Sequence, residues 1–147
     1  MKHVKKSVLL WYSAQEMYDL VTDVPLYPKF LPWCDRAEVL TTSEDGMTAR
    51  LHLSYHGLRH AFTTRNTHVP GRQIGMRLVK GPFSRLEGDW SFQPVGDGTH
   101  DACRVGLELR YGFSSMALGA VVGPVFDRIA GSLVDAFVKR AEQVYGG

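Results

Sequence analysis

Apolar and polar residues alternate along much of the chain between residues 47 and 113, which is typical of β-strands with one covered face. The clearest run is Cys103 to Phe113, where every second residue is apolar. Met47 to Tyr55 alternates in the same way, and further strands are predicted after Gly71 and around residues 86–92. This pattern predicts an antiparallel sheet with one face in water and the other covered.

Both ends of the chain carry helical signals. Apolar residues recur every three or four positions from Val122 to Val144, which predicts a long amphipathic helix. Pro124 should kink this helix or begin its main segment, because proline lacks an amide hydrogen. Near the amino terminus, a strand over residues 4–10 precedes Ser13-Ala14-Gln15-Glu16, a capping box that predicts a short helix. A second helical turn is expected over residues 24–30.

A two-residue turn at His56-Gly57 predicts a hairpin with a definite register. In that register His60, Thr64 and Asn66 lie on the covered, apolar face. Polar groups in such a place need hydrogen-bond partners. We expect them either to bond to one another and to water or to meet the polar head of a ligand.

Together these elements predict an α+β fold in which six or seven antiparallel strands wrap around one long carboxyl-terminal helix. The expected order is a strand, two short helices, six strands and the long helix, in a single domain over residues 1–147. Small residues early in the long helix should leave room for an apolar cavity between helix and sheet. They are Ala117, Gly119, Ala120 and Gly123.

The composition, 44% hydrophobic and 22% charged, is that of an ordinary globular protein. No apolar run approaches the roughly 20 residues that span a bilayer, and the first residues do not resemble a signal peptide. We therefore expect a cytoplasmic protein. Cys34 and Cys103 lack metal-ligand spacing, so they are expected to be buried as small hydrophobic residues.

Charge is distributed unevenly. Between Asp45 and Glu87 the chain has no acidic residue but seven bases. On adjacent strands these bases are expected to form a positive surface suited to RNA phosphates, with scattered solvated arginines as the alternative. The seven are Arg50, Arg59, Arg65, Arg72, Arg77, Lys80 and Arg85. No aromatic residues interleave with them, so neither base-specific RNA recognition nor DNA binding is expected.

The sequence contains no nucleophile elbow, zinc-protease helix or glycine-rich phosphate loop. His52, His56 and His60 are evenly spaced, but the hairpin sends His52 and His60 to opposite faces, which argues against a shared metal ion. We therefore expect neither an enzyme nor a metal site, and no required cofactor.

Four stretches resemble the helix-grip, START-like (SRPBCC) superfamily, and within it the coenzyme Q-binding branch, whose bacterial members are called ribosome association toxins. They are VPLYPKFLPWCDRAEVL (24–40), GPFSRLEGDWSFQP (81–94), CRVGLELRYGFSS (103–115) and VDAFVKRAEQVYG (134–146). The resemblance implies, as the leading expectation, binding of ubiquinone or another prenyl lipid in support of respiratory electron transfer. The alternative that it implies is binding of the large ribosomal subunit, which blocks subunit association. Polyketide cyclases are more distant members, but this chain offers no catalytic constellation.

The resemblance also places YPKFLPW (residues 27–33) at a helical corner beside the cavity mouth, where it either closes over a prenyl chain or plugs the end of the sheet. The predicted lid residues are Tyr27, Phe30, Leu31 and Trp33. The predicted cavity residues are Leu51, His60, Phe62, Thr64, Trp90, Phe92, Phe126, Ile129, Leu133 and Phe137. Packing in the core is the alternative for this set. Transient contact with the inner membrane is a further expectation.

Overall fold

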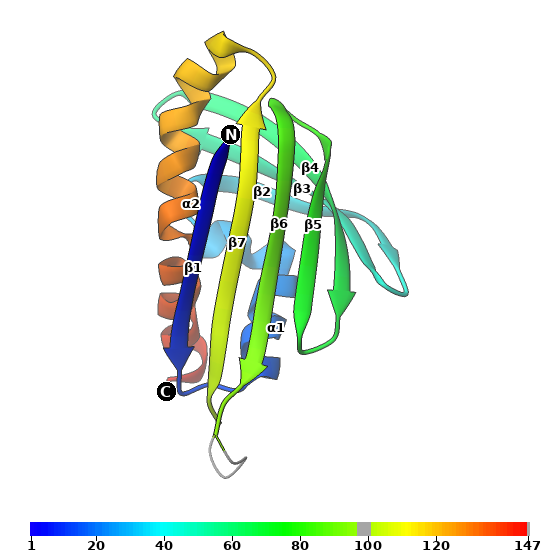
Figure 1. Cartoon of the computed structure of the whole chain (residues 1–147), viewed down its shortest axis with the longest axis vertical. Coiled ribbons are helices and arrows are strands. Elements are labelled where there is room, and N and C mark those ends of the chain that lie inside the picture. Colours follow the sequence, from blue (N-terminus) through cyan, green and yellow to red (C-terminus); the bar gives the residue numbers. More distant parts are fainter. Residues whose placement is uncertain (97–100, 147) are drawn as a thin grey trace.

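A computed structural model describes residues 1–96 and 101–146 of the chain. These residues form a seven-stranded antiparallel sheet, two short helices and one long helix (Figure 1). The strands are β1 (Lys2–Leu10), β2 (Cys34–Ser43), β3 (Gly46–Tyr55), β4 (Leu58–Val69), β5 (Gln73–Lys80), β6 (Phe83–Pro94) and β7 (Cys103–Phe113). The helices are α1 (Ala14–Thr22), the 3-10 helix η1 (Val24–Lys29) and α2 (Met116–Tyr145). The predicted helix-grip fold and order of elements are confirmed.

The strands lie in the order β1-β7-β6-β5-β4-β3-β2, so the first strand pairs with the last one. The sheet bends strongly, with β2 to β4 turning away from the plane of β1, β7 and β6 (Figure 1). Helix α2 packs against β1 and β7 on the concave side. Most of the predicted turn at residues 96–100 lies outside the described residues.

The β3–β4 hairpin has the predicted register. Leu53 pairs with His60 and Ala49 pairs with Thr64. His56 and Gly57 both have positive φ, at 48° and 82°, as the tight turns that suit twisted strands require. Local turn chemistry therefore sets which side chains of β4 face the helix.

Helix α1 begins with the predicted capping box. The Ser13 hydroxyl accepts from the backbone N–H of Glu16, and the Glu16 carboxylate accepts from the backbone N–H of Ser13. The two bonds satisfy amide groups that the first turn leaves without partners. Helix α1 buries Met17 and Val21, and it ends before Pro25 as expected.

Two expectations about the start of α2 are wrong. Of the two roles predicted for Pro124, beginning the main helical segment is excluded, because Pro124 lies inside one continuous helix that Ser115 caps nine residues earlier by accepting from the N–H of Leu118. The early small residues do not widen the cavity. Ala120 is exposed, and a Cβ added at Gly119 or Gly123 would contact only Phe113. Gly119 and Gly123 instead line a separate surface pocket beside Tyr111 and Phe113 of β7.

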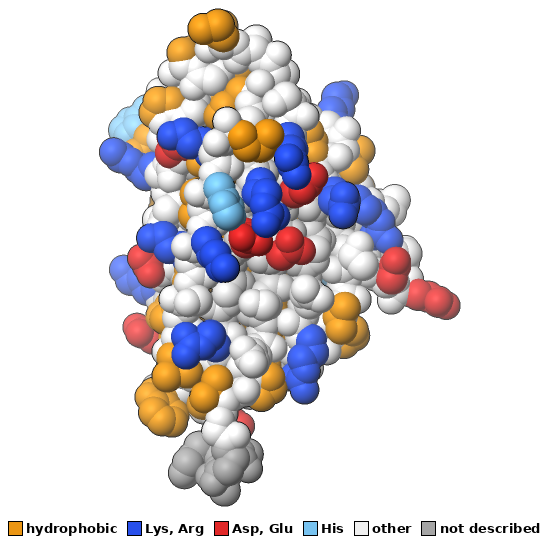
Figure 2. All heavy atoms as spheres, in the orientation of Figure 1, with side chains coloured by type: hydrophobic (Ala, Val, Ile, Leu, Met, Phe, Trp, Pro, Cys, Tyr) orange, Lys and Arg blue, Asp and Glu red, His pale blue; other side chains and the backbone are white. Residues whose placement is uncertain are grey.

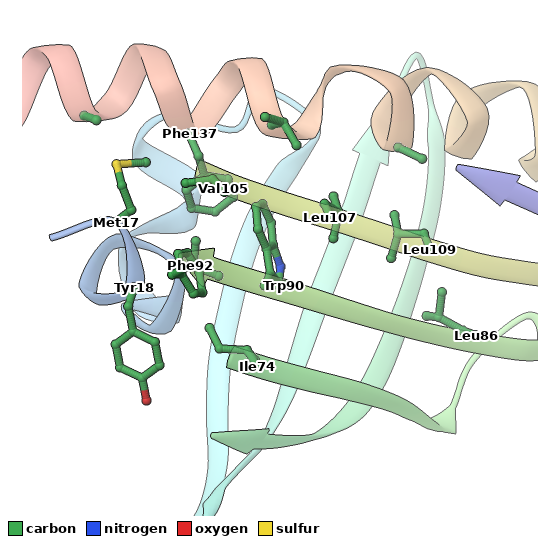
Figure 3. Packing of buried hydrophobic residues seen from close by; sticks show 14 of the residues in the cluster. Met17, Tyr18, Ile74, Leu86, Trp90, Phe92, Val105, Leu107, Leu109 and Phe137 are labelled. Atoms are coloured by element: carbon green, nitrogen blue, oxygen red, sulfur yellow. The ribbon is translucent and has the colours of Figure 1, made fainter. Parts of the chain in front are cut away.

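The rest of α2 packs in the concavity of the sheet. Phe137 reaches from the helix to the layer that contains Trp90 and Val105 (Figure 3), and its ring centre lies 5.3 Å from that of Trp90. Nearer the helix start, the hydroxyl of the fully buried Tyr111 donates to the Asp127 carboxylate at 2.5 Å. Burial, reinforced by Asp127, raises the pKa of Tyr111. This bond ties α2 to β7.

Candidate ligand cavity and charged outer face

An apolar cavity lies between α2 and the concave face of the sheet. Its volume is about 80 Å³, measured as the space open to the centres of water molecules. Lining side chains come from η1, from strands β3 to β7 and from α2, and apart from Thr64 and Asn66 they are aliphatic or aromatic. Such a site would select a ligand mainly by apolar contact.

Most of the predicted cavity residues line this cavity. They are Tyr27, Leu31, Trp33, Leu51, Phe62, Thr64, Trp90, Phe126, Ile129, Leu133 and Phe137. The same cavity is also lined by Val24, Ala49, Asn66, Met76, Leu86, Gly88, Leu109 and Ala130, which the predicted set omits. Strand alternation was the signal that could have found Ala49, Leu86 and Leu109, because each lies in phase with a predicted residue on its own strand or the next.

Three predicted residues lie elsewhere. Phe92 is 1% exposed and packs between Tyr18 and Trp90 at the end of the core, away from the cavity. His60 lines a shallow surface pocket, because the β3–β4 hairpin extends beyond the cavity near its turn. Phe30 is half-buried and lines a groove on the outer side of the lid.

The two polar residues in the cavity bond to each other. The Thr64 hydroxyl donates to the side-chain oxygen of Asn66 at 2.8 Å, and both residues are buried. Among the described residues, the carboxamide nitrogen of Asn66 has no hydrogen-bond partner. It remains available to donate to a carbonyl group of a ligand.

The predicted lid forms one wall of the cavity through Tyr27, Leu31 and Trp33. The hydroxyl of Tyr27 donates to the backbone carbonyl of Val21, and burial raises the pKa of this phenol. Leu31 and Trp33 are 1% and 8% exposed. Cys34, just after the lid, is also buried, which raises the pKa of its thiol to about 11 and leaves little reactive thiolate at neutral pH.

The outer face of the sheet carries an interleaved set of bases and acids (Figure 2). Cross-strand pairing places Arg65, Arg77, Glu87, Arg110 and His3 in one row over five strands. The acid-free stretch of sequence therefore does not make an acid-free surface.

Two of the seven predicted surface bases form ion pairs. Arg65 contacts Asp45 at 2.7 Å, and Arg85 contacts Glu87 at 3.0 Å. Asp45 and Glu87 are the acids that bound the acid-free stretch of sequence. Among the described residues, no ion pair involves the other five bases, which are Arg50, Arg59, Arg72, Arg77 and Lys80.

These ion pairs lower the pKa of several carboxylates. A hydrogen bond from Arg85 lowers the pKa of Glu87, and a hydrogen bond with His3 lowers that of Glu108. The Ser43 hydroxyl, and then Arg65, do the same for Asp45. All three groups are exposed to solvent, so each contribution to stability is small.

The lowered pKa values predict acid sensitivity. A carboxylate whose folded pKa is depressed stabilises the fold above its unfolded value, near 4.5 for glutamate, and loses that contribution as pH falls through the folded pKa. We expect the melting temperature to drop between about pH 5 and pH 3. In Glu87→Gln the drop should be shallower. In Glu44→Gln, which removes an exposed carboxylate from the β2–β3 turn, the slope should match the parent. Equal slopes of melting temperature against pH in all three proteins would contradict the assignment of acid sensitivity to Glu87.

The curved antiparallel sheet, the long helix packed against it and the apolar cavity define a helix-grip protein. Residues 10–138 match the family described as "Polyketide cyclase / dehydrase and lipid transport", and the chain belongs to this family. The START-like resemblance seen in the sequence is confirmed.

Named relatives fall into two groups. The chain is 44% identical to the ribosome association toxin of Pseudomonas aeruginosa, covering 98% of both chains, and 43% identical to that of Vibrio cholerae, covering 99% of both. It is 30% identical to a mitochondrial coenzyme Q-binding protein of Xenopus laevis, over 96% of this chain and 58% of that one. Neither name describes an enzyme.

Solved structures share the fold. A protein from Caulobacter crescentus has a TM-score of 0.75 at 33% identity, with complete coverage of both chains. An aromatase/cyclase from a Streptomyces species has a TM-score of 0.79 at 18% identity, covering 99% of this chain and 98% of that one. At that identity the second similarity shows the fold alone.

Proposed function

We propose that this protein is a non-enzymatic cytoplasmic protein that binds the large ribosomal subunit and blocks its association with the small one. The observation that carries the proposal is 43–44% identity, along nearly the whole chain, to bacterial proteins named ribosome association toxins. The identity to the mitochondrial coenzyme Q-binding protein is lower, at 30% over 58% of that protein. This difference favours ribosome binding over quinone carriage.

The bases on β3 to β5 are the proposed contact surface. Arg50 and Lys80 both pair with Thr63, from opposite sides, so the two bases flank one position on β4. Arg77 lies on the same strand as Lys80, next to Arg65. Several exposed bases within a few strands can contact a phosphate backbone without reading its sequence.

Co-sedimentation with purified large subunits tests this proposal. We expect binding that weakens as salt is raised, because phosphate contacts release counterions. The double variant Arg50→Glu/Lys80→Glu should bind about ten-fold more weakly or worse. Arg128→Glu/Lys139→Glu makes the same charge change on exposed positions of α2 and should bind like the parent. Absence of the parent protein from the subunit fractions would refute the proposal. An equal loss of binding in both variants would refute the assignment of the contact to the bases on β3 to β5.

A second candidate function is binding of an apolar ligand, such as a prenyl quinone, in the cavity. The apolar lining with one buried Thr64–Asn66 pair favours it. A quinone tail would require the lid to open. This function uses the interior and ribosome binding uses the outer face, so one protein can have both.

Organic extraction of protein purified from its native cells, followed by mass spectrometry, tests the second candidate. We expect a near-stoichiometric lipid that disappears in Ala130→Leu, because Ala130 is buried and lines the cavity. Ala141→Leu adds the same volume at an equally buried position of α2 outside the cavity and should keep the lipid. An empty extract from well-folded parent protein would exclude a stably bound ligand.

A further inference from the structure

A basic groove lies on the surface between η1 and the carboxyl-terminal turns of α2. Its volume is about 430 Å³. Lys29, Lys139 and Arg140 line it, with Asp135 as the single acidic residue among its lining residues. None of these three bases forms an ion pair with a described residue. The groove is therefore a place where an anion would be attracted.

The Phe30 ring lies between this groove and the apolar cavity. On its inner side it packs against Phe137 and Tyr27, with ring centres 5.1 Å and 6.0 Å away, and both of those residues line the cavity. On its outer side the guanidinium carbon of Arg140 lies 5.3 Å from the centre of the Phe30 ring. A basic surface and an apolar interior are thus separated by one aromatic side chain at this point.

Phe30 lacks the anchors that the other lid residues have. Tyr27 is tied by its hydroxyl to the backbone of Val21, and Leu31 and Trp33 are buried. Phe30 is half-buried, and its side chain has no polar group to anchor it. Ring packing and the contact with Arg140 hold it in place. A cation–π contact at a partly exposed site is weaker than a hydrogen-bonded pair between arginine and a carboxylate or phosphate.

We propose that the groove binds the anionic head, a carboxylate or a phosphate monoester, of a single-chain amphiphile whose chain enters the cavity past Phe30. The head group draws the guanidinium of Arg140 away from the ring. The ring then moves aside, and the chain takes its place against Phe137 and extends the cavity toward the surface. This inference rests on the cavity being a ligand site, the second candidate function above.

Binding of defined amphiphiles to the full chain tests the groove. Trp33 and Trp90 line the cavity, so their fluorescence should report entry of a chain. Below their micelle concentrations, dodecanoate and dodecyl phosphate should bind about ten-fold more tightly than dodecanol. Acetate and inorganic phosphate, which carry the charge without the chain, should leave the fluorescence unchanged and should compete only at concentrations far above that of dodecanoate.

Two matched variants distinguish recognition of the head group from binding of the chain. Arg140→Gln should bring dodecanoate binding down to that of dodecanol, with dodecanol binding little changed. Arg128→Gln removes the same charge from an exposed position of α2 outside the groove and should behave like the parent. Phe30→Ala should speed the entry of every chain, because the ring that closes the mouth is gone.

The outcomes distinguish this proposal from the one it rests on. If dodecanol binds as tightly as dodecanoate, or if Arg128→Gln weakens dodecanoate as much as Arg140→Gln does, the basic groove is not a head-group site, although the cavity still binds chains. Competition by acetate or inorganic phosphate at concentrations as low as that of dodecanoate would also overturn it, because the site would then need no chain. If none of the twelve-carbon compounds binds to folded protein, the cavity is not a ligand site and both proposals fail.

Discussion

The Phe126→Ala substitution is expected to lower the free energy of unfolding by about 3–5 kcal/mol. Phe126 is 4% exposed, and its ring lies 4.7 Å from that of Tyr111 and 4.9 Å from that of Phe83. Removing the ring forfeits these contacts, together with edge contacts to two further aromatic rings. It also enlarges the neighbouring cavity, which cannot collapse because rigid strands form its other wall.

Urea denaturation of parent and variant measures this loss. Val121→Ala is the control, since Val121 lies one turn earlier on α2 and is 58% exposed. Its cost should be about 0.5 kcal/mol or less. Similar costs for the two substitutions would mean that this part of α2 does not pack into the core as described. A loss in Phe126→Ala that dodecanoate reverses would instead show that the enlarged cavity accepts a chain.

The Gly46→Ala substitution should cost about 1–3 kcal/mol or more. Gly46 begins β3 with a φ of 157°, and a methyl group there would overlap the backbone carbonyl of Asn66 on β4. Backbone atoms cannot move aside as a flexible side chain can, so the strands must separate or the turn must change. Because Asn66 carries the polar pair of the cavity, the displacement should also reach the candidate ligand site.

Gly57→Ala is the matched control for Gly46→Ala. Gly57 lies at the next hairpin turn with a φ of 82°, and an added Cβ would meet no atom within 4 Å. Its cost is therefore conformational strain alone, about 1 kcal/mol. Thermal melting of both variants measures the difference. A smaller loss for Gly46→Ala than for Gly57→Ala would contradict the close approach of β3 and β4.

Features that depend on neighbouring residues were predictable from the sequence. The capping box at Ser13 and the turn at His56-Gly57 each form within a few residues, and both have the predicted geometry. The turn then set the register of β3 and β4, and the period-two pattern assigned most cavity residues to the covered face. Capping residues, turn residues and the alternation of apolar side chains therefore account for the secondary structure along most of the chain.

The pattern did not predict features that depend on where along its length a strand or helix stops being covered by its neighbours. Phe92 and His60 lie in phase with cavity residues, yet one packs at the end of the core and the other reaches the surface. Gly123 was expected beside the cavity, but it does not line the cavity and packs near Phe113 at the end of β7 instead. Periodicity gives the face on which a side chain lies. It does not give the position along that face at which the covering element ends.

The sequence by itself determined the strands, the helices and the covered face, because period and turn chemistry are local properties. Only the tertiary structure decided which charges meet. Asp45 precedes Arg65 by 20 residues and His3 is far from Glu108 in the sequence, but strand pairing brings each of these pairs into contact. It likewise decided that Phe30 faces a basic groove while Tyr27, three residues earlier, faces the cavity. Contacts between distant parts of a chain arise from packing, and a one-dimensional pattern does not record them.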